Sequence, residues 1–493
     1  MPTSPPASDV ASPFATSELP SAGALVLFGI SGDLAKKMLL PALYQLTKAG
    51  KLTVPVVGVA RCDWDDDTLR KQAREDLVDA GVEIDEDVFA RFASLLSIVT
   101  GDFDDPATFD KLKEATAGRG FLTHYLAVPP SLFTVVAAAL AKAGLNDNAR
   151  LVVEKPFGHD LASAKQLEAS LTGYFKPDNL LRVDHFLGNT AVESLMVARF
   201  ANMLLAPVWH RDYVDNVQIS LVEDFDVADR GSFYDAVGCL RDVVENHMMQ
   251  VLAYFAMDPP NNSTSGSQAM EKWRVLNATR PMEPADTVRG QYTGYQDVQG
   301  VTPGSTTDTY FATRLFVDNW RWAGVPFYMR SGKALALTAT EVVVQLKKPP
   351  MDLFAGFDTE GTPPDLVRFR LDYDTGIRAD LMVRRPKDGG PPVSVPMGVD
   401  YAQVMGRQEL PYENILYGAI IGDPTCFAFY PTILECWRVA EPMLDYPHPP
   451  LPYEPGSWGP AAADDLPGLV DGWHNPGRLL FDGNPVGSPT PAD

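Results

Sequence analysis

Short apolar runs alternate with amphipathic segments through the first 190 residues. Residues 25–28 form an apolar run that leads through a glycine turn into a helix with one apolar stripe. The stripe consists of Leu34, Met38, Leu39 and Leu43. We expect further strands in VPVVGVAR, THYLAVPP and ARLVVEKPFG, with an acidic helix at 65–80 and an alanine-rich helix at 131–144 between them. Strands that alternate with helices predict a parallel, doubly wound sheet up to about residue 190.

The pattern changes beyond residue 200 to longer strands with alternating polarity. They lie in NVQISLVEDF, TYFATRLFVDNWRWAG, TEVVVQLKKP and LVRFRLDYDTGIRADLMVRR. Such alternation predicts an antiparallel sheet with one covered face. Proline and glycine concentrate in 349–365, 386–398 and 441–493, which predicts loops and a loosely ordered C-terminus.

Length and charge limit the classes of function. A chain of 493 residues exceeds one ordinary core, so we expect two or more domains. The formal net charge of −23 repels polyanions and gives no footprint for nucleic acid or an anionic membrane surface. The longest apolar runs, such as VVAAALA at 135–141, are far too short to span a membrane. A small anionic ligand would therefore need a local cluster of Lys or Arg.

The N-terminus and the cysteines favour a cytoplasmic protein. Residues 1–20 lack the basic start and continuous apolar middle of a secretory signal, and their Pro, Ser and Thr content predicts a disordered tail. The four cysteines form no CxxC motif and are too sparse for a disulfide framework, so we expect reduced thiols.

The turn GISGD after the first strand is a candidate dinucleotide site. Gly29 and Gly32 would let backbone N–H groups approach a pyrophosphate at the positive end of the helix. The motif is weaker than G-x-G-x-x-G, because Ser31 and Leu34 occupy its second and third glycine positions. A purely structural turn is the alternative. If the site is real, it comprises Gly29, Ser31, Gly32, Asp33 and Leu34.

Arg61 ends the second predicted strand, where dinucleotide folds discriminate at the adenosine ribose. An arginine there favours the 2′-phosphate of NADP, and Asp63 two residues later leaves NAD open. A solvated surface arginine is the other reading.

Two further positions suggest chemistry. Lys155 in EKPFG closes a predicted parallel strand, so it would point into the crevice where such sheets bind ligands, unless it is a plain surface lysine. His247 lies on the apolar stripe of a predicted helix, where a core histidine is the ordinary interpretation. A histidine that takes a proton needs an acid to fix its tautomer, and Asp184 is such an acid.

Six motifs together resemble the glucose-6-phosphate dehydrogenase family. In chain order they are GISGDLAKK, EKPFGHDLASA, RVDHFLGN, RDVVENHMMQ, VPFYMRSGKAL and YEPGSWGPAAADDL, and the likeness covers about residues 22–470. The resemblance implies α/β plus α+β architecture: a Rossmann-like dinucleotide domain at 21–195, then a larger α+β domain with an extended antiparallel sheet at 196–493 for substrate and oligomerisation. It further implies hydride transfer from C1 of glucose 6-phosphate to NADP, the entry to the pentose phosphate pathway, in a homodimer or homotetramer.

The resemblance also assigns roles to single residues. His247 matches the general base, and Asp184 the acid that orients it. Lys155 matches a lysine between sugar and nicotinamide. Four further positions match substrate ligands: Glu223 and Asp242 for the sugar hydroxyls, Lys333 for the substrate, and His185 for the phosphate.

The phosphate motif departs from the family pattern R-x-D-H-Y-L-G-K. Phe186 replaces its tyrosine, and Asn189 replaces the lysine that clamps the 6-phosphate, although we count Asn189 as a substrate-site position. Thr338 stands where the family commonly has a cation, and Phe133 where the cofactor side often has tyrosine.

These departures leave three functions open. The chain is a glucose-6-phosphate dehydrogenase with a weakened phosphate site, a paralogue for a different or unphosphorylated aldose, or a non-catalytic, cofactor-binding regulatory subunit. Glucose-fructose oxidoreductases also carry an EKP lysine, but RVDHFLG and GSWGP argue against that group.

Overall fold

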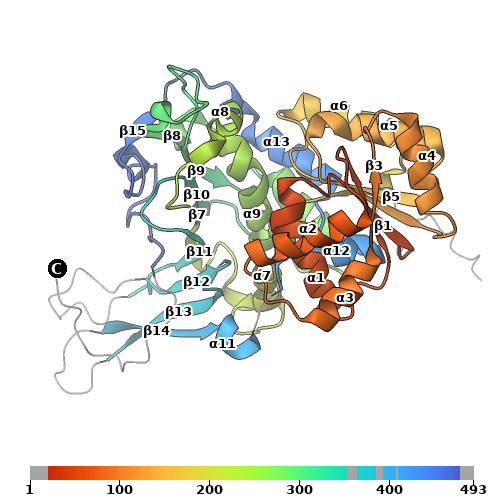
Figure 1. Ribbon diagram of the computed structural model, residues 1–493. Helices are drawn as coiled ribbons and strands as arrows, with labels where there is room; N and C mark the ends of the chain where they lie inside the picture. Colours follow the sequence, from red (N-terminus) through yellow and green to blue (C-terminus); the bar gives the residue numbers. More distant parts are fainter. Residues whose placement is uncertain (1–19, 352–363, 373, 385–391, 407–408, 478–493) are drawn as a thin grey trace, which may run out of the picture. The chain divides into compact units, whose positions relative to one another are not determined.

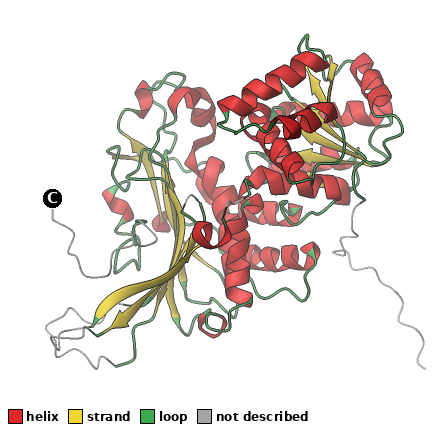
Figure 2. Ribbon diagram, turned by 60° about the horizontal axis from the view of Figure 1, so that its bottom comes forward, coloured by secondary structure: helices red, strands yellow, loops and turns green. Residues whose placement is uncertain are grey.

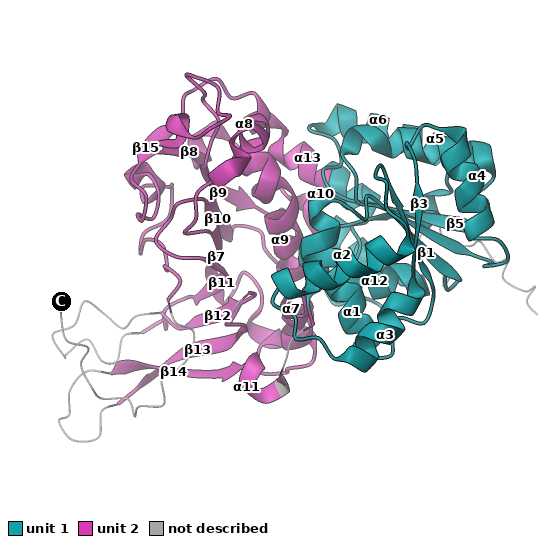
Figure 3. Cartoon of the chain, viewed as in Figure 1, with its two compact units in different colours: residues 1–188, 257–274, 410–434 teal, residues 189–256, 275–409, 435–493 magenta. Residues whose placement is uncertain are grey.

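The computed structural model describes residues 20–351, 364–372, 374–384, 392–406 and 409–477. The chain divides into two compact units (Figure 3): unit 1 holds residues 1–188, 257–274 and 410–434, and unit 2 holds residues 189–256, 275–409 and 435–493. The predicted disordered tail lies outside the described residues apart from Pro20. No helix in the described part of the chain is long and apolar enough to cross a membrane.

Unit 1 is built on a parallel six-stranded sheet, of which β1, β3 and β5 are labelled in Figure 1. Its strand order is β3-β2-β1-β4-β5-β6, which confirms the predicted doubly wound fold. Its strands are β1 (Ala24–Phe28), β2 (Val56–Ala60), β3 (Leu96–Thr100), β4 (Leu122–Leu126), β5 (Ala149–Val153) and β6 (Leu180–Arg182). Its helices are η1 (Ala35–Leu39), α1 (Leu40–Lys48), α2 (Asp66–Asp79), α3 (Glu86–Leu95), α4 (Pro106–Ala115), α5 (Phe133–Ala143), α6 (Leu161–Thr172), η4 (His185–Gly188) and α12 (Pro411–Ile421).

Helices cover both faces of this sheet (Figure 2). Successive side chains of each strand point to opposite faces, so both sets of side chains are buried under helices. Leu25 and Leu27 of β1 pack in one core cluster with α1, α2, α3 and α12. Val26 and Phe28 pack in the other, with α4 and α5. The strands are therefore apolar on both faces, which is why they appear as short continuous apolar runs.

Helix α12 joins unit 1 from far along the chain. Ile415 and Leu416 lie in the same core cluster as α1, and the Thr123 hydroxyl donates to the Ala419 carbonyl over 3.0 Å. The predicted 196–493 domain contains this helix, whereas the compact units place residues 410–434 with the parallel sheet. The difference arises because long-range packing, and not chain order, decides where α12 belongs.

Unit 2 is built on a nine-stranded sheet with strand order β14-β13-β12-β11-β7-β10-β9-β8-β15. The strands are β7 (Val214–Val222), β8 (Thr287–Tyr292), β9 (Tyr310–Phe316), β10 (Pro326–Gly332), β11 (Ala339–Leu346), β12 (Leu366–Arg370), β13 (Gly376–Val383), β14 (Val393–Asp400) and β15 (Leu451–Tyr453). The sheet is mixed and not purely antiparallel, because β7 pairs in parallel with β10 and β8 in parallel with β15.

Parts of two segments that were predicted to be loops have defined structure. Within 386–398, residues from Val393 onward belong to β14, an edge strand that tolerates Pro396 because an edge strand needs donors on one side only. The C-terminal segment through Gly477 also has defined contacts: Arg330 lies between the rings of Trp458 and Trp473, with its guanidinium carbon 4.9 and 4.4 Å from their centroids. Residues 478–493 lie outside the described part.

The helices of unit 2 include the one that carries Asp242 and His247. They are α7 (Thr190–Phe200), α8 (Gly231–Cys239), the π-helix η7 (Leu240–Met248), α9 (Met249–Ala256) and α11 (Tyr401–Met405), while α10 (Ser265–Ala278) and α13 (Tyr430–Leu444) each contain residues of both units. All residues of α9 are buried, and η7 packs against β7 and β10. Strands β7 and β10, which precede Glu223 and Lys333, and the helix with His247 therefore pack together within unit 2.

Candidate active site

The glycine turn connects β1 to the helix that begins at Asp33. Gly29 has a left-handed φ of 83°, and a side chain there would meet the Ala127 carbonyl oxygen at 2.3 Å, so only glycine fits. The Gly32 N–H closes the turn onto the Gly29 carbonyl over 2.9 Å. The first amides of a helix lack intrahelical partners and attract anions, so this turn fits a dinucleotide pyrophosphate. Ser31 and Leu34 are half-buried beside it, and Asp33 is exposed.

Arg61 follows β2 directly and is exposed. Its guanidinium carbon lies 5.6 Å from the ring centroid of Phe103, and none of the carboxylates in the described part of the chain forms an ion pair with it. The side chain is thus held against an aromatic ring with its charge available to a ligand. This placement fits the predicted contact with a 2′-phosphate.

Lys155 follows β5 at the same edge of the sheet, because all six strands are parallel. The residue before it, Glu154, is buried and accepts a hydrogen bond from the Tyr125 hydroxyl over 2.5 Å and a second one from Tyr412. Burial raises the pKa of Glu154 to about 7, against the lowering effect of these two hydrogen bonds and of the Lys155 charge. Lys155 therefore extends from a backbone that a buried, hydrogen-bonded carboxyl anchors.

Asp184 and His185 follow β6, also at this edge. The buried Asp184 carboxylate accepts the Phe186 N–H over 3.0 Å, which fixes the start of η4. The His185 ring stacks on Tyr412 at 6.5 Å between centroids and 15° between planes. Helix α12 thus supports this motif, and the Asn414 amide adds a hydrogen bond to the Gly188 carbonyl over 3.0 Å.

Asn189 begins helix α7 in unit 2, and its side chain acts within the fold. Its Oδ1 accepts the Ala191 N–H over 2.9 Å as an N-cap, and its Nδ2 donates to the Leu371 carbonyl over 2.9 Å. The structure thus accounts for the amide that replaces the family's lysine, without a ligand. Its assignment to the substrate site stays a prediction.

Glu223 and Lys333 lie together at the ends of neighbouring parallel strands. Glu223 follows β7, Lys333 follows β10, and the lysine ammonium pairs with the Glu223 carboxylate. Both side chains are largely buried, at 22% and 11% exposure. The structure therefore brings two of the predicted sugar ligands into direct contact, as an anion and a cation side by side.

Asp242 and His247 lie on η7. His247 is only 3% exposed, and Asp242 is half-buried. The hydrogen bonds of a π-helix run from residue i to i+5, so residues five apart lie about one turn apart. In an α-helix the same two residues would point about 140° apart. The π form therefore brings Asp242 and His247 to nearly one face.

The other departures from the family pattern also have local partners. The Thr338 hydroxyl donates to the Asp224 carboxylate and accepts the Asp224 N–H over 3.0 Å. Phe133 is fully buried in the core of unit 1. The Phe186 ring contacts His185 with 5.1 Å between centroids. Each of these three side chains thus has contacts within its own unit.

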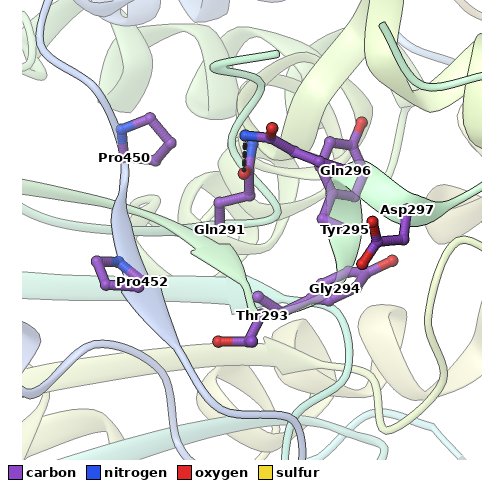
Figure 4. Close-up of a pocket in the computed structure, with 9 residues that line it drawn as sticks. Gln291, Thr293, Gly294, Tyr295, Gln296, Asp297, Pro450 and Pro452 are labelled. Atoms are coloured by element: carbon purple, nitrogen blue, oxygen red, sulfur yellow. Dashed lines mark hydrogen bonds between the residues drawn. The ribbon is translucent and has the colours of Figure 1, made fainter. Parts of the chain in front are cut away.

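A separate surface hollow lies in unit 2 (Figure 4). It has a volume of about 230 Å³ and is lined by Gln291, Tyr292, Thr293, Gly294, Tyr295, Gln296, Asp297, Pro450 and Pro452. The amide of Gln296 donates to Gln291 over 3.2 Å, and the amide of Gln291 donates to the Ser305 and Thr307 carbonyls. The predicted site residues do not line this hollow, and its glutamines hold the turn.

Comparison with known families decides the assignment. Residues 26–194 match the family model "Glucose-6-phosphate dehydrogenase, NAD binding domain", and residues 196–471 match "Glucose-6-phosphate dehydrogenase, C-terminal domain". The chain belongs to the glucose-6-phosphate dehydrogenase family. Both halves of the family architecture are therefore present, in the order that the motifs predicted.

Individual members of the family extend the match over nearly the whole chain. The chain is 42% identical to glucose-6-phosphate 1-dehydrogenase 1 of Mycobacterium tuberculosis, covering 92% of this chain and 96% of the relative. The glucose-6-phosphate 1-dehydrogenase of Aggregatibacter actinomycetemcomitans is 36% identical, with coverage of 92% and 98%.

Solved structures of the family agree with the fold. The crystal structure of glucose-6-phosphate 1-dehydrogenase from Mycobacterium avium superposes with a TM-score of 0.86 at 43% identity, covering 93% of this chain and 99% of the other. A glucose-6-phosphate dehydrogenase in complex with its substrate glucose-6-phosphate gives a TM-score of 0.85 at 29% identity, with coverage of 94% and 100%. The expected glucose-6-phosphate dehydrogenase fold is thereby confirmed.

Three residues that support the candidate site were not predicted from the sequence. Glu154 carried a signal, since it is an acid at the end of a buried strand directly before Lys155. Tyr412 carried none, because its partners lie more than 200 residues away in the chain. Asp308, which holds the start of η7, was also hidden in a polar segment before β9.

Proposed function

We propose that this chain oxidises glucose 6-phosphate at C1 to the 6-phosphogluconolactone with NADP as hydride acceptor. The observation that carries this proposal is 42% identity over 92% of the chain to a relative named for that activity. The glycine turn after β1 fits the dinucleotide, which accepts the hydride when bound. In this proposal residues 21–195 act as the dinucleotide domain, and residues 196–493 act as the domain for substrate binding and oligomerisation.

His247 acts as the general base. It takes the proton of the C1 hydroxyl as the hydride leaves C1, and a base tuned near working pH typically contributes 10²–10⁴-fold to such a step. Burial of His247 in η7 supports this role, since a buried imidazole is held in one orientation. In the same proposal, Asp184 is the acid that orients His247.

The remaining site residues bind and orient the sugar. Glu223 and Asp242 accept hydrogen bonds from sugar hydroxyls, while Lys155, Lys333 and His185 supply positive charge or donors toward the substrate. The ion pair of Glu223 with Lys333 supports this division, because it places a hydrogen-bond acceptor and a donor side by side in a largely buried place.

NADP is the preferred cofactor in this proposal because of Arg61. Its guanidinium is exposed and held against Phe103, ready for a bidentate contact with a 2′-phosphate. Asp63, also exposed, keeps NAD as the alternative acceptor.

A second candidate is a paralogue with a different or unphosphorylated aldose. The observation that favours it is the engagement of Asn189 and Thr338 within the fold, where the family carries cations. A regulatory subunit without turnover is the third outcome of the same test.

We further propose a homodimer or homotetramer in the cytoplasm. An apolar strip on one face of β13 and β14 supports self-association: Leu381, Val383, Met397 and Val399 are 38–55% exposed. Contiguous exposed apolar side chains commonly mark interaction surfaces.

Steady-state rates test the proposed reaction and its two alternatives together. NADP and NAD are each combined with glucose 6-phosphate, glucose and related aldoses. The proposal expects the highest kcat/KM with glucose 6-phosphate and NADP. A higher kcat/KM with another aldose would establish the paralogue, and dinucleotide binding without turnover on any sugar would establish the regulatory subunit.

A further inference from the structure

The helix that carries Asp242 and His247 begins at a break in the chain. Gly238, the next to last residue of α8, has φ 72° and ψ 172°, so the chain kinks there and η7 starts in a new direction. The first amides of η7 have no partners within the helix. The Asp308 segment supplies them: the Cys239 N–H donates to the Asp308 carbonyl over 2.9 Å, and the Leu240 N–H to the Asp308 carboxylate over 3.2 Å.

Asp308 is itself fixed by Arg289. One guanidinium nitrogen lies 3.2 Å from the other oxygen of the Asp308 carboxylate. The same guanidinium donates to the carbonyls of Tyr446, His448 and Thr306, each over 3.1 Å. The two side chains are largely buried, at 14% and 10% exposure. Both carboxylate oxygens of Asp308 therefore have assigned partners, and its orientation is set.

The neighbouring residue connects the same segment to Lys333. The Thr309 carbonyl accepts the Lys333 N–H over 2.9 Å, and the Tyr453 hydroxyl, 3.1 Å from that carbonyl, donates over 2.7 Å to the Lys333 carbonyl. Two consecutive residues thus hold the start of η7 and the end of β10. Their spacing fixes Asp242 and His247 relative to Lys333 and its partner Glu223 within unit 2.

We propose that Asp308, oriented by Arg289, is a positioning residue that sets the start of η7 and so the directions of Asp242 and His247. A π-helix brings residues five apart to one face only while its wide turns are kept. An anchor at its first amides prevents relaxation toward α geometry, in which the two side chains would diverge. The assignment of the reaction to these side chains rests on the proposed function.

The variants are Asp308→Ala and Asp308→Asn, with Asp286→Ala as the matched control. Asp286 pairs with Arg314 over 2.6 Å in the same unit, is similarly buried at 12% exposure, and touches neither η7 nor Lys333. Asp308→Ala should lower kcat with glucose 6-phosphate by about tenfold or more, because misplacement by about 1 Å can cost 10²-fold. KM for NADP should stay unchanged. The kcat of Asp308→Asn should lie between those of wild type and Asp308→Ala, since the amide oxygen of asparagine can still accept the Leu240 N–H.

Hydrogen exchange gives a readout that needs no substrate. The amides of residues 239–248 should exchange faster in Asp308→Ala than in wild type, and unchanged in Asp286→Ala, because only the first variant loses the anchor. If the wild type turns over no sugar, the proposed function has failed, and this exchange experiment still decides on the anchor.

Three results would overturn the inference. The first is kcat within twofold of wild type together with unchanged exchange in Asp308→Ala. The second is an equal loss of kcat in Asp308→Ala and Asp286→Ala, which would mean that any lost ion pair has the same effect. The third result applies if Asp308→Ala does not fold: kcat and hydrogen exchange in Asp308→Asn that are unchanged from wild type.

Discussion

Restoring the family's lysine at position 189 tests how this chain treats the 6-phosphate. Asn189→Lys introduces the cation that the family uses, but it removes the N-cap to Ala191 and the hydrogen bond to the Leu371 carbonyl. Loss of an N-cap costs about 0.5–2 kcal/mol, and loss of an ordinary hydrogen bond costs about 1 kcal/mol. The variant should therefore be less stable by about 1.5–3 kcal/mol, which a folded protein with about 5–15 kcal/mol of stability tolerates.

The gain in binding should appear in KM. A charged contact with a phosphate contributes about 1.5–3 kcal/mol, so KM for glucose 6-phosphate should fall roughly tenfold or more. KM for unphosphorylated glucose should not change, because the lysine has no anion to contact there. Such a selective gain would mean that the wild-type site is a weakened version of the family's phosphate site.

Asn189→Ala is the matched control, because it loses the same cap and hydrogen bond without adding a charge. Steady-state KM for both sugars and the midpoint of thermal unfolding are measured for the two variants and wild type. Both variants should unfold at lower temperature than wild type, and only the lysine should lower KM. Equal KM for glucose 6-phosphate in the two variants would refute the reasoning and show that Asn189 is fitted to another substituent or to the fold alone.

Three further substitutions test single roles. His247→Asn should lower kcat by about 10²–10⁴-fold and leave dinucleotide affinity nearly intact. Near-normal turnover would mean that His247 is an ordinary core histidine and not the base. Arg61→Ala should lower kcat/KM for NADP by roughly tenfold or more with little change for NAD, whereas equal changes for both would exclude contact with the 2′-phosphate. Burial raises the pKa of Glu154 from 4.5 to about 7, so the folded chain holds a proton that the unfolded chain releases, and stability falls as pH rises through this range. In wild type, the free energy of unfolding should fall by about 3 kcal/mol between pH 4.5 and 7, and Glu154→Gln should remove this fall, as denaturant titrations would show. Parallel profiles of unfolding free energy against pH in the two proteins would contradict the raised pKa.

Strands β1, β2, β4 and β5 could be predicted because each is a short run that is buried on both faces, as Leu25 to Phe28 illustrate. Strand β6 was not predicted, because its three residues are too few to give such a run. Strand β14 was missed because Pro396 argues against a strand unless one knows that it lies at an edge. The parallel pairing of β7 with β10 was missed because β8 and β9 intervene in the chain. Local pattern carries no information on which strands meet after such a connection.

The candidate site divides in the same way. Gly29 and Lys155 could be placed because each follows a predicted strand, and parallel strands share one carboxyl edge. Asp184 became a candidate from its motif alone, because the short strand β6 before it was not predicted. The role of Asn189 as an N-cap was readable from its residue type, but its contact with Leu371 was not. Tyr412 supports His185, and Asp308 supports η7, through contacts between segments that are distant in the chain. No local sequence pattern predicts such contacts.

Transfer of the C1 hydrogen is the most direct test of the proposed reaction. The purified chain is incubated with NADP and glucose 6-phosphate deuterated at C1, and the reduced cofactor is analysed by mass spectrometry. We expect one deuterium in the NADPH that forms, and 6-phosphogluconate, from hydrolysis of the lactone, as the sugar product. Absence of reduced cofactor, or NADPH without the label, would contradict the proposed reaction.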